Sequence, residues 1–328
     1  MRCDSIRPMF RRKSLLERAM ERQIRERFGP PERSSYTGFR RGFNTGFIGA
    51  AIIVGAVSLA WLILFPPLPR TNILLLGVDR RPGETYVSRT DTMILATLNV
   101  PEGKIGLLSI PRDLWVTLPN GQEGRINTAH FFGEAGLEGT GPAAAVQTVR
   151  DTFGVDVHRF VRIDFNGFVR IVNAVGGLEL DIPNPIVDDA YPTEDFGYQT
   201  VEFAAGRQWL SGERALQYAR IRHGSSDIQR AERQAAVIRA FAVRLTQPGA
   251  WLRLPALLAA LQESVATDIT LSDLIRITPF VLRVGAGGLD QRVIDATMTQ
   301  PFQTASGASV LLPVWEQINP VLLEMFGQ

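Results

Sequence analysis

The chain contains three short apolar segments in close succession: NILLLGV (72–78), TMILATLN (92–99) and KIGLLSI (104–110). Each is bounded by Gly, Pro, Asn or Asp, which favour turns. Their nearly continuous apolar character is typical of strands covered on both faces, because a half-exposed strand alternates apolar with polar residues. The pattern therefore predicts a β-sheet covered by helices.

Four helices are predicted downstream, at 142–153, 165–175, 212–219 and 227–246. Pro142 favours the first position of a helix, Asp164 is a suitable N-cap, and Gly154 favours a helix end. Strand-like segments that alternate with helical ones indicate an α/β protein. We expect residues 72–328 to form one α/β domain, a mixed β-sheet with helices on both faces (an α-β-α sandwich).

Composition excludes several classes of protein. The 328 residues are 45% hydrophobic and 21% charged, which excludes collagen-like and wholly disordered chains. The single cysteine, Cys3, excludes an intramolecular disulfide framework and a cysteine-based zinc site. Residues 1–43 contain 12 Lys or Arg against 5 Asp or Glu, and the remaining residues contain 23 against 28. A basic tail of net charge +7 therefore precedes an acidic remainder of net charge −5.

An uncharged segment follows the basic tail. Gly46–Phe65 (GFIGAAIIVGAVSLAWLILF) holds no charged residue, and at about 1.5 Å per residue a helix of this length spans about 30 Å, the thickness of the hydrocarbon layer. We predict a transmembrane helix at 44–65 and a linker at 66–71. Because basic residues remain on the cytoplasmic side, the tail (1–43) is expected in the cytoplasm and residues 72–328 outside the membrane.

The tail itself is predicted to be partly helical. Leu16, Met20, Ile24 and Phe28 recur every four residues and form an apolar stripe on a basic helix. Such a helix suits the surface of anionic lipid, or simply sets the topology of the chain. No motif that reads nucleic acid accompanies it, so no nucleic-acid partner is expected.

Several catalytic motifs are absent from the sequence. The three histidines, His130, His158 and His223, form no HExxH pattern, and there is no G-x-S-x-G elbow or G-x-x-x-x-G-K-[ST] loop. The sequence therefore gives no support for a zincin, an α/β-hydrolase or a P-loop protein. The run GAGG (285–288) lacks the strand and helix that flank a dinucleotide-binding loop and is interpreted as a turn.

Charged residues stand at the ends of the predicted strands. Asp79 follows NILLLGV directly, and Arg112 comes two residues after KIGLLSI. Ligands of open α/β sheets bind beyond the carboxyl ends of the strands. Arg89 and Asp91 precede the middle segment, so Asp91 reaches the same rim if that strand runs antiparallel to the first. Taken singly, either aspartate is better explained as a locally satisfied turn or strand-edge residue; together with the arginines described below, the pair favours a binding site.

Two arginines precede the long helix predicted at 227–246. If YARIRH (218–223) is extended, Arg220 and Arg222 project from one face about 6 to 7 Å apart, a spacing that suits adjacent phosphates.

The stripe of the long helix that faces the core begins with charged and polar residues. Asp227, Arg230 and Gln234 lie on it, with Arg233 at its edge. N-terminal capping explains Asp227 alone. Since buried charges must be paired or bound, the first turns of this helix are expected to face a polar ligand or cleft.

These residue types suit a diphosphate. Arginine forks match phosphate oxygens, and paired aspartates supply hard oxygen ligands for Mg²⁺, which keeps phosphate and water in its shell. Arginine identity alone proves little, because the chain has 33 Arg and only 2 Lys. Their clustering in an acidic domain does require a local cause. The implied substrate carries a pyrophosphate.

At these residues the sequence resembles the LytR-CpsA-Psr family of bacterial envelope proteins. One departure is Arg125-Ile126-Asn127, where the family usually has Lys-Ile-Asn. The resemblance rests on seven ordered segments: NILLLGVDRR (72–81), SRTDTMILATLN (88–99), LLSIPRDLWV (107–116), RINTAHFFG (125–133), AVGGLELDI (174–182), GERALQYARIRH (212–223) and DIQRAERQ (227–234).

The resemblance implies a phosphotransferase that moves a glycopolymer from a polyprenyl-pyrophosphate carrier to peptidoglycan through a phosphodiester. It implies Mg²⁺, or Mn²⁺ in its place, as cofactor, a glycan-bearing lipid donor, a peptidoglycan acceptor and an apolar tunnel for the lipid between sheet and helices. The protein is expected in the bacterial cell membrane as a single-pass protein. The implied site comprises catalytic Asp91, Arg89 and Asp227, metal ligands Asp79 and Asp91, and diphosphate-binding Arg112, Arg125, Arg220, Arg222, Arg230, Arg233 and Gln234.

Two other functions fit the same residues. A polyprenyl or nucleoside pyrophosphatase would use water as the acceptor, and the sequence does not separate transfer from hydrolysis. A non-catalytic envelope regulator would capture the lipid headgroup with its arginines alone. Asp79 and Asp91 argue against pure capture, because carboxylates do not help to bind an anion unless a cation joins them. The glycopolymer, the acceptor hydroxyl, the general base and the oligomeric state stay open.

Overall fold

The computed structural model describes residues 14–29, 52, 54–55, 69–80, 87–193, 197–221 and 227–327. The chain divides into two compact units, Met1–Leu64 and Phe65–Gln328. In the first, α1 (Leu15–Phe28) confirms the helix predicted in the basic tail. The predicted anchor at 44–65 lies outside the described residues except for 52, 54 and 55. None of the helices in the described ranges combines the length and the apolar composition needed to cross a bilayer.

A mixed sheet forms the centre of the second unit. Strands β1 and β2 pair antiparallel, β2 and β3 pair antiparallel, β1 and β6 pair parallel, and so do β3 and β12. The middle strand thus runs antiparallel to the first, which is the condition for Asp91 to reach the same rim. Within the described residues the order is β11-β6-β1-β2-β3-β12, built from β1 (Thr71–Val78), β2 (Thr90–Asn99), β3 (Lys104–Ile110), β6 (Arg159–Asp164), β11 (Val265–Thr267) and β12 (Leu289–Val293).

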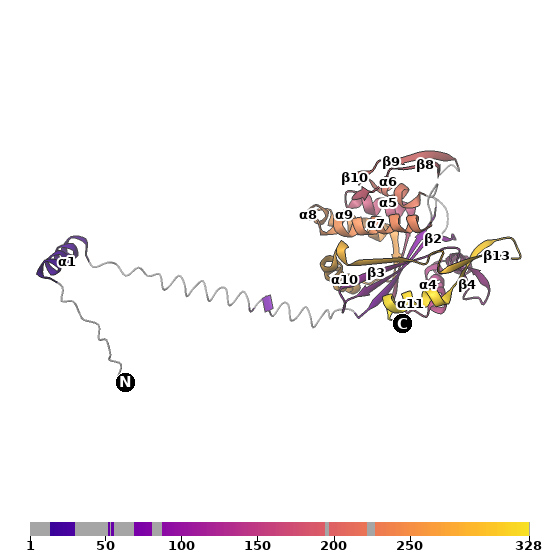
Figure 1. Cartoon of the computed structure of the whole chain (residues 1–328), viewed down its shortest axis with the longest axis horizontal. Coiled ribbons are helices and arrows are strands. Elements are labelled where there is room, and N and C mark those ends of the chain that lie inside the picture. Colours follow the sequence, from indigo (N-terminus) through magenta and orange to yellow (C-terminus); the bar gives the residue numbers. More distant parts are fainter. Residues whose placement is uncertain are drawn as a thin grey trace, which may run out of the picture. The chain divides into compact units, whose positions relative to one another are not determined.

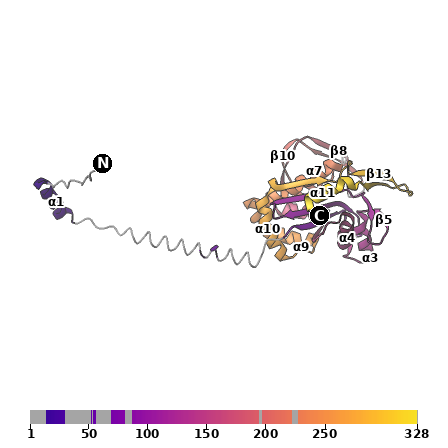
Figure 2. The same cartoon turned by 60° about the horizontal axis from the view of Figure 1, so that its bottom comes forward.

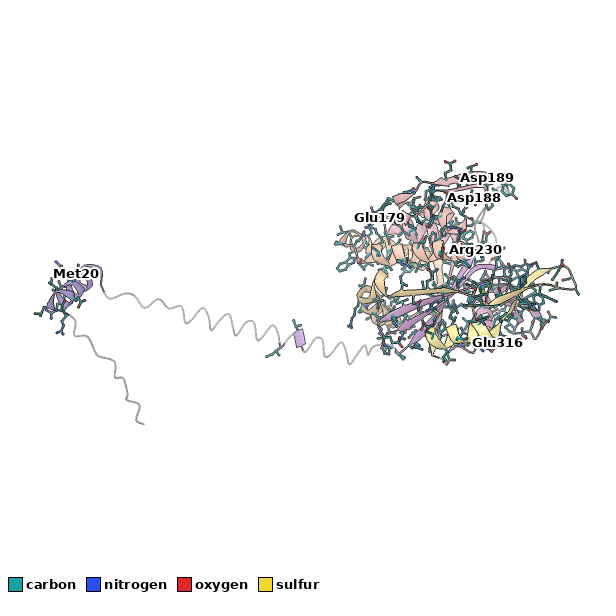
Figure 3. All side chains as sticks on the ribbon, in the orientation of Figure 1. Met20, Glu179, Asp188, Asp189, Arg230 and Glu316 are labelled. Atoms are coloured by element: carbon teal, nitrogen blue, oxygen red, sulfur yellow. The ribbon has the colours of Figure 1, made fainter. Side chains whose placement is uncertain are left out.

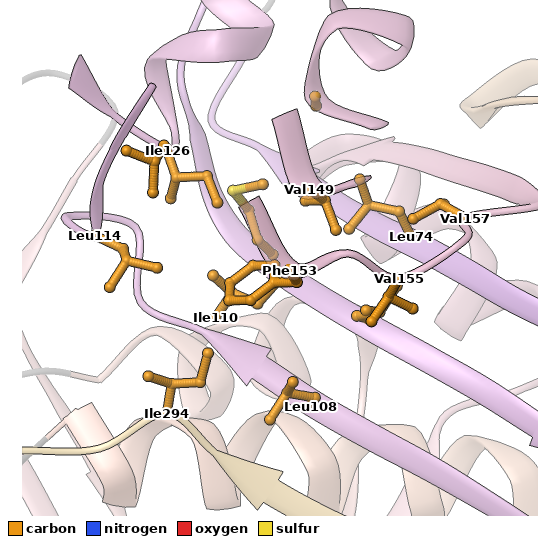
Figure 4. Packing of buried hydrophobic residues seen from close by; sticks show 14 of the residues in the cluster. Leu74, Leu108, Ile110, Leu114, Ile126, Val149, Phe153, Val155, Val157 and Ile294 are labelled. Atoms are coloured by element: carbon orange, nitrogen blue, oxygen red, sulfur yellow. The ribbon is translucent and has the colours of Figure 1, made fainter. Parts of the chain in front are cut away.

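Helices cover both faces of this sheet (Figures 1 and 2). Leu74 and Leu76 of β1 face one layer, whereas Ile73 and Leu75 face the other, because side chains alternate along a strand. The first layer contains α3 (Thr128–Gly136), α4 (Gly141–Phe153) and α11 (Trp315–Phe326). The second contains α7 (Asp227–Thr246) and α10 (Leu271–Val284). Figure 4 shows Leu108, Phe153 and Ile294 in the core of the first layer.

Local sequence accounts for the helix ends. In α4, Pro142 occupies the first turn and Gly154 ends the helix at a φ of 66°, a left-handed conformation that glycine adopts without strain. The Asp164 side chain accepts a hydrogen bond from the Gly167 amide and caps α5 (Phe165–Ala174). The structure confirms all four helices predicted downstream, at 142–153, 165–175, 212–219 and 227–246.

A second hydrophobic core packs beside the sheet. It lies among α5, α7, α6 (Gly212–Arg220), α9 (Leu254–Ser264) and the ribbon of β7 (Leu178–Ile182) with β10 (Gly206–Leu210). The remaining elements are β4 (Trp115–Thr117), β5 (Glu123–Arg125), β8 (Ile186–Pro192), β9 (Tyr198–Phe203), α8 (Pro248–Trp251), η1 (Ala286–Gly288), β13 (Thr299–Gln303) and β14 (Ser309–Pro313).

The extended conformation considered for residues 218–223 is wrong for its first part. Residues as far as Arg220 belong to α6, which Ser211 caps by accepting a hydrogen bond from the Arg214 amide. With Ala, Leu and Gln after that cap, helix propensity outweighs the alternating pattern. Residues 222–226 lie outside the described ranges.

Truncation of a core side chain should show how much packing in the first layer contributes to the free energy of unfolding. Leu108 is 0% exposed, so Leu108→Ala should lower the free energy of unfolding by about 2 to 5 kcal/mol through lost burial and the cavity left behind. Urea titration of the detergent-solubilised chain checks this. Leu323→Ala, at a position that is 63% exposed, is the control and should cost under about 1 kcal/mol; equal effects would contradict the assignment of the core.

Candidate functional site

Three charged side chains meet at one edge of the central sheet. Asp79 directly follows β1, and Asp91 is the second residue of β2. Arg112 lies two residues after the end of β3. Because β2 runs antiparallel to both neighbours, its beginning lies beside their ends. A cavity of about 480 Å³ opens there, lined by Asp79, Asp91, Thr92, Arg112, Phe165, Asp188, Ala190, Pro192, Tyr198, Ala219, Arg220, Arg230 and Gln234.

Two arginine–aspartate pairs form in this cavity. Arg112 Nη1 donates to Asp91 Oδ1 at 2.6 Å, and Arg220 Nη2 lies 3.7 Å from Asp79 Oδ2. Burial lowers the pKa of Arg112, but the hydrogen bond and charge of Asp91 outweigh burial and raise this pKa above its ordinary value. Arg112 is therefore held as a cation at the cavity wall.

Aromatic rings hold the Arg220 guanidinium. Its central carbon lies 4.0 Å from the centre of the Phe165 ring and 5.6 Å from that of Tyr191, whose hydroxyl is 3.4 Å from Nη1. Burial raises the pKa of Tyr191, although Arg220 opposes that shift. Stacking favours one orientation of the guanidinium plane and leaves donors directed at the cavity.

Helix α7 contributes Arg230 and Gln234 to the same cavity, as the shared stripe predicted. The Gln234 amide donates to Thr92 Oγ1 at 3.2 Å and ties the helix to β2.

Asp188 was missed by the sequence reasoning. It is 2% exposed on β8, and Figure 3 labels it together with Arg230. Its neighbours in sequence gave no sign of the cavity, because a separate ribbon brings it there.

The other predicted site residues do not line this cavity. Arg233 is 8% exposed and donates to the Ile221 carbonyl at 2.6 Å, beside a different cavity. Arg125 lies 3.2 Å from Asp113 and also binds the Ser309 carbonyl. Arg89 is exposed on the segment before β2. Arg222 and the side chain of Asp227 lie outside what the structure describes.

Two further cavities adjoin the charged one. An apolar cavity of about 220 Å³ lies between the sheet and helices α5, α6 and α7. A third, of about 360 Å³, lies on the β3 side. Both share Thr92 and Gln234 with the charged cavity. The apolar cavity is lined by Leu75, Leu76, Gly77, Thr92, Ile94, Val161, Ile163, Asp164, Phe165, Phe168, Leu216, Ala219, Arg220, Gln234, Val237 and Ile238.

Residues 69–319 match the sequence profile of the LytR_cpsA_psr family. The chain belongs to this family. A curated relative is the polyisoprenyl-teichoic acid–peptidoglycan teichoic acid transferase TagU of Oceanobacillus iheyensis, which is 32% identical over 266 residues, 80% of this chain and 78% of that protein.

Solved structures share the fold. The crystal structure of Bacillus subtilis TagV superposes with a TM-score of 0.62 at 24% identity, covering 79% of this chain and 98% of that one. A structure of TagT bound to LI-WTA superposes with a TM-score of 0.60 at 22% identity, covering 79% and 92%.

The donor set of this LytR_cpsA_psr site fits a hydrated cation better than a metal enclosed by protein. Asp79 and Asp91 both line the charged cavity. No cluster of three or more His, Cys, Asp or Glu side chains suited to a metal exists among the residues that the structure describes. Mg²⁺ usually takes one or two carboxylates and completes its shell with water and substrate phosphate. Two carboxylates beside phosphate-matching arginines meet that requirement.

A buried network supports the segment that leads to Asp91. His130, which is 0% exposed, contacts the Ser88 carbonyl through Nδ1 at 2.9 Å. Glu134 accepts a hydrogen bond from Arg162 and lies 3.8 Å from His130 Nε2. Burial, with help from the Arg162 charge, lowers the pKa of His130, although the Ser88 carbonyl opposes the shift. The imidazole is therefore neutral in the folded protein near neutral pH.

The lowered pKa of His130 should make stability depend on pH. The unfolded chain binds a proton at His130 as pH falls through 6.5, the ordinary value, whereas the folded chain binds it only at lower pH. The contribution of His130 to the free energy of unfolding is therefore complete above pH 6.5 and is lost as the pH falls below that value. The free energy of unfolding then decreases by up to about 1.4 kcal/mol per pH unit. Urea titrations between about pH 7.5 and 5.5 should show a smaller slope in His130→Gln than in the wild type. Equal slopes would contradict this origin.

Proposed function

We propose that this protein transfers a glycopolymer from a polyprenyl-pyrophosphate carrier to peptidoglycan through a phosphodiester. The observation that carries the proposal is the junction of two unlike cavities. A cavity with three arginines and three aspartates adjoins an apolar cavity between sheet and helices. A polyprenyl diphosphate has the same two parts, a highly charged head and an apolar tail.

The relatives support the glycan part of the proposal. The TagU relative is named for transfer of teichoic acid from a polyisoprenyl carrier to peptidoglycan, and the TagT structure contains LI-WTA. These names concern those proteins. For this chain they favour an envelope glycopolymer as the cargo, with peptidoglycan as the acceptor.

The proposed reaction is a phosphoryl transfer. A hydroxyl oxygen of peptidoglycan bonds to the phosphorus that carries the glycan, and the bond from this phosphorus to the oxygen of the polyprenyl phosphate breaks. The hydroxyl proton is released, and polyprenyl phosphate leaves. Such transfers proceed through a loose transition state, so the protein contributes mainly position and charge stabilisation.

Three arginines are assigned to the diphosphate oxygens. Arg112 and Arg220 are already oriented by Asp91 and by the Phe165 and Tyr191 rings, respectively. Arg230 faces them from α7 in the same cavity. Guanidinium groups that are fixed before the substrate arrives need no reorganisation as negative charge moves to the leaving phosphate, which is the source of electrostatic catalysis.

Asp79 and Asp91 are assigned to Mg²⁺. When bound, the ion supplies neutralisation of phosphate charge, and Mn²⁺ fits the same hard donors. Asp91 and Asp227 are the candidate acceptors of the hydroxyl proton. Arg89, Arg125, Arg222 and Arg233, which do not line the charged cavity or lie outside the described residues, keep only their sequence-based assignment.

The same proposal includes a membrane location. The uncharged segment 46–65 and the basic tail before it predict a single-pass anchor with a cytoplasmic N-terminus. The α/β domain then lies outside the membrane, on the side where peptidoglycan is found. The family to which the chain belongs is named for envelope proteins, which agrees with this location.

A product assay tests the function. Full-length protein in detergent micelles receives a short-chain polyprenyl-pyrophosphate glycan, Mg²⁺ and peptidoglycan oligomers, and mass spectrometry follows the products. A glycan-phosphate adduct on peptidoglycan is expected, and Asp91→Asn should reduce its rate by about 10²-fold or more, because the substitution removes one charge from the reacting centre.

The control is Asp151→Asn, at an exposed position on α4, which should leave the rate unchanged. Glycan phosphate released without an adduct would instead indicate a pyrophosphatase. Donor recovered intact with the protein would indicate a binder. A rate that survives both Asp91→Asn and a chelator would contradict the metal assignment.

Filling the apolar cavity should discriminate against long lipids. Ala219 lies where the apolar and charged cavities join, so Ala219→Leu removes space for the first part of the tail. We expect KM for a long-chain donor to rise about tenfold, equivalent to about 1.4 kcal/mol of lost binding, with a smaller change for a donor that has a very short tail. Ala143→Leu, at an exposed position on α4, is the matched control. Equal effects on both donors would contradict the assignment of this cavity to lipid.

A further inference from the structure

A nearly continuous run of exposed apolar residues joins α8 to α9. In the sequence WLRLPALLA (251–259), only Leu257 is buried. The exposed fractions reach 65% for Trp251, 87% for Leu252, 49% for Leu254 and 47% for Leu258. Contiguous apolar surface of this kind usually marks an interaction site. We call residues 251–259 the α8–α9 face.

The charged residues that neighbour this face in the sequence are mostly basic, and Glu263 near the end of α9 is the first acidic residue after it. Between Arg239 and Gln262 the chain has three arginines, at 239, 244 and 253, and no acidic residue, although the chain after residue 43 carries a net charge of −5. Trp251 donates its indole N–H to the Leu245 carbonyl at 2.9 Å, so the ring is exposed while its polar atom is satisfied. Apolar side chains with a tryptophan and an arginine rim are typical of surfaces that enter the headgroup region of anionic membranes.

The first turn of α10 lies near the start of β1. Ile73 pairs with Arg159 at the beginning of β6, and Arg159 Nε lies 2.9 Å from Asp273 in the first turn of α10. Leu271 and Leu274 of that turn are also exposed, by 73% and 41%. Figures 1 and 2 both show α9 and α10 at one end of the domain and β13 at the other.

Chain length limits how far this end can lie from the bilayer. Five residues, Pro66–Arg70, separate the end of the predicted anchor at Phe65 from β1. Fully extended, they span under about 20 Å. With the anchor of the proposed function ending at Phe65, the start of β1 would lie within that distance of the outer membrane surface.

We propose that the α8–α9 face docks on the outer surface of the membrane that carries the protein, with Leu252 and Leu258 inserted among lipid headgroups. The inference rests on the membrane anchor included in the proposed function and is independent of the reaction. Docking fixes the orientation of the domain, so that the sheet edge with the charged cavity points away from the bilayer.

Depth-dependent quenching tests the proposal on the full chain. Cys3→Ser provides a background without cysteine, and Leu252→Cys or Leu258→Cys then carries an environment-sensitive fluorophore. The protein is reconstituted in vesicles of phosphatidylglycerol and phosphatidylcholine. Phe302→Cys, at a position on β13 that is 48% exposed, is the matched control at the opposite end.

Labels at 252 and 258 should lose at least about half of their emission with brominated acyl chains, since such surfaces insert by about 5 to 10 Å, and should resist iodide. The label at 302 should show the reverse. If 252 and 258 behave like 302 while the protein floats with the vesicles, docking is disproved and the anchor stands. Protection from both quenchers would mean a protein partner, such as a second copy, and would also overturn the proposal. Failure to float would remove the anchor, and docking with it, while the product assay judges the transferase separately.

Discussion

The antiparallel course of β2 between β1 and β3 is the constraint on which the site depends. It brings the residue after β1, the second residue of β2 and the segment after β3 to one edge of the sheet. Asp79, Asp91 and Arg112 therefore meet although up to 33 positions separate them in the sequence. In an all-parallel sheet the beginning of β2 would lie at the opposite edge, and Asp91 would be about a strand length away.

The balance of charge explains how this edge remains stable without a ligand. Three aspartates and three arginines line the charged cavity, and two of the pairs are in contact. Each carboxylate offsets the cost of holding a guanidinium away from bulk water. A diphosphate accompanied by a divalent cation adds both signs together, so the arginines can bind phosphate with their remaining N–H groups and the carboxylates can bind the cation with their remaining oxygens, while the existing pairs stay in place. Arginine alone would bind an anion; the paired set suits an anion that arrives with its metal.

Sequence reasoning succeeded where local signals and topology agree. The apolar runs of β1, β2 and β3 and the caps of α4 and α5 depend on neighbouring residues, which the sequence displays directly. The edge strands escaped notice because β11 has only three residues and β12 (LDQRV) is largely polar.

Within the site, closeness along α7 did not by itself identify which residues line the charged cavity. Arg230 and Gln234 are four residues apart and share a face, whereas Arg233 turns about 60° away from Arg230 and binds the end of α6. Asp188 depends on how the β8–β9 ribbon folds over the sheet edge, and no short-range pattern encodes that. Asp79 and Asp91 could be predicted, because the ends of strands point to a shared rim.

One edge of the sheet carries the charged cavity, and the opposite edge lies near the proposed membrane contact. The apolar cavity lies between these two edges. The eight residues of β1 span about 26 Å from the end near the proposed membrane contact to the charged cavity. A lipid whose diphosphate reaches Arg112 and Arg220 while its tail stays in the bilayer must therefore cover most of that length along the protein. Leu75 and Ile94 line the apolar cavity, and Ile277 and Phe280 of α10 continue the same apolar layer on the face of the sheet covered by α7. With the domain docked as proposed, a short isoprenoid would fill the site without bridging this distance, so the proposed function and the proposed docking together favour a long polyprenyl carrier.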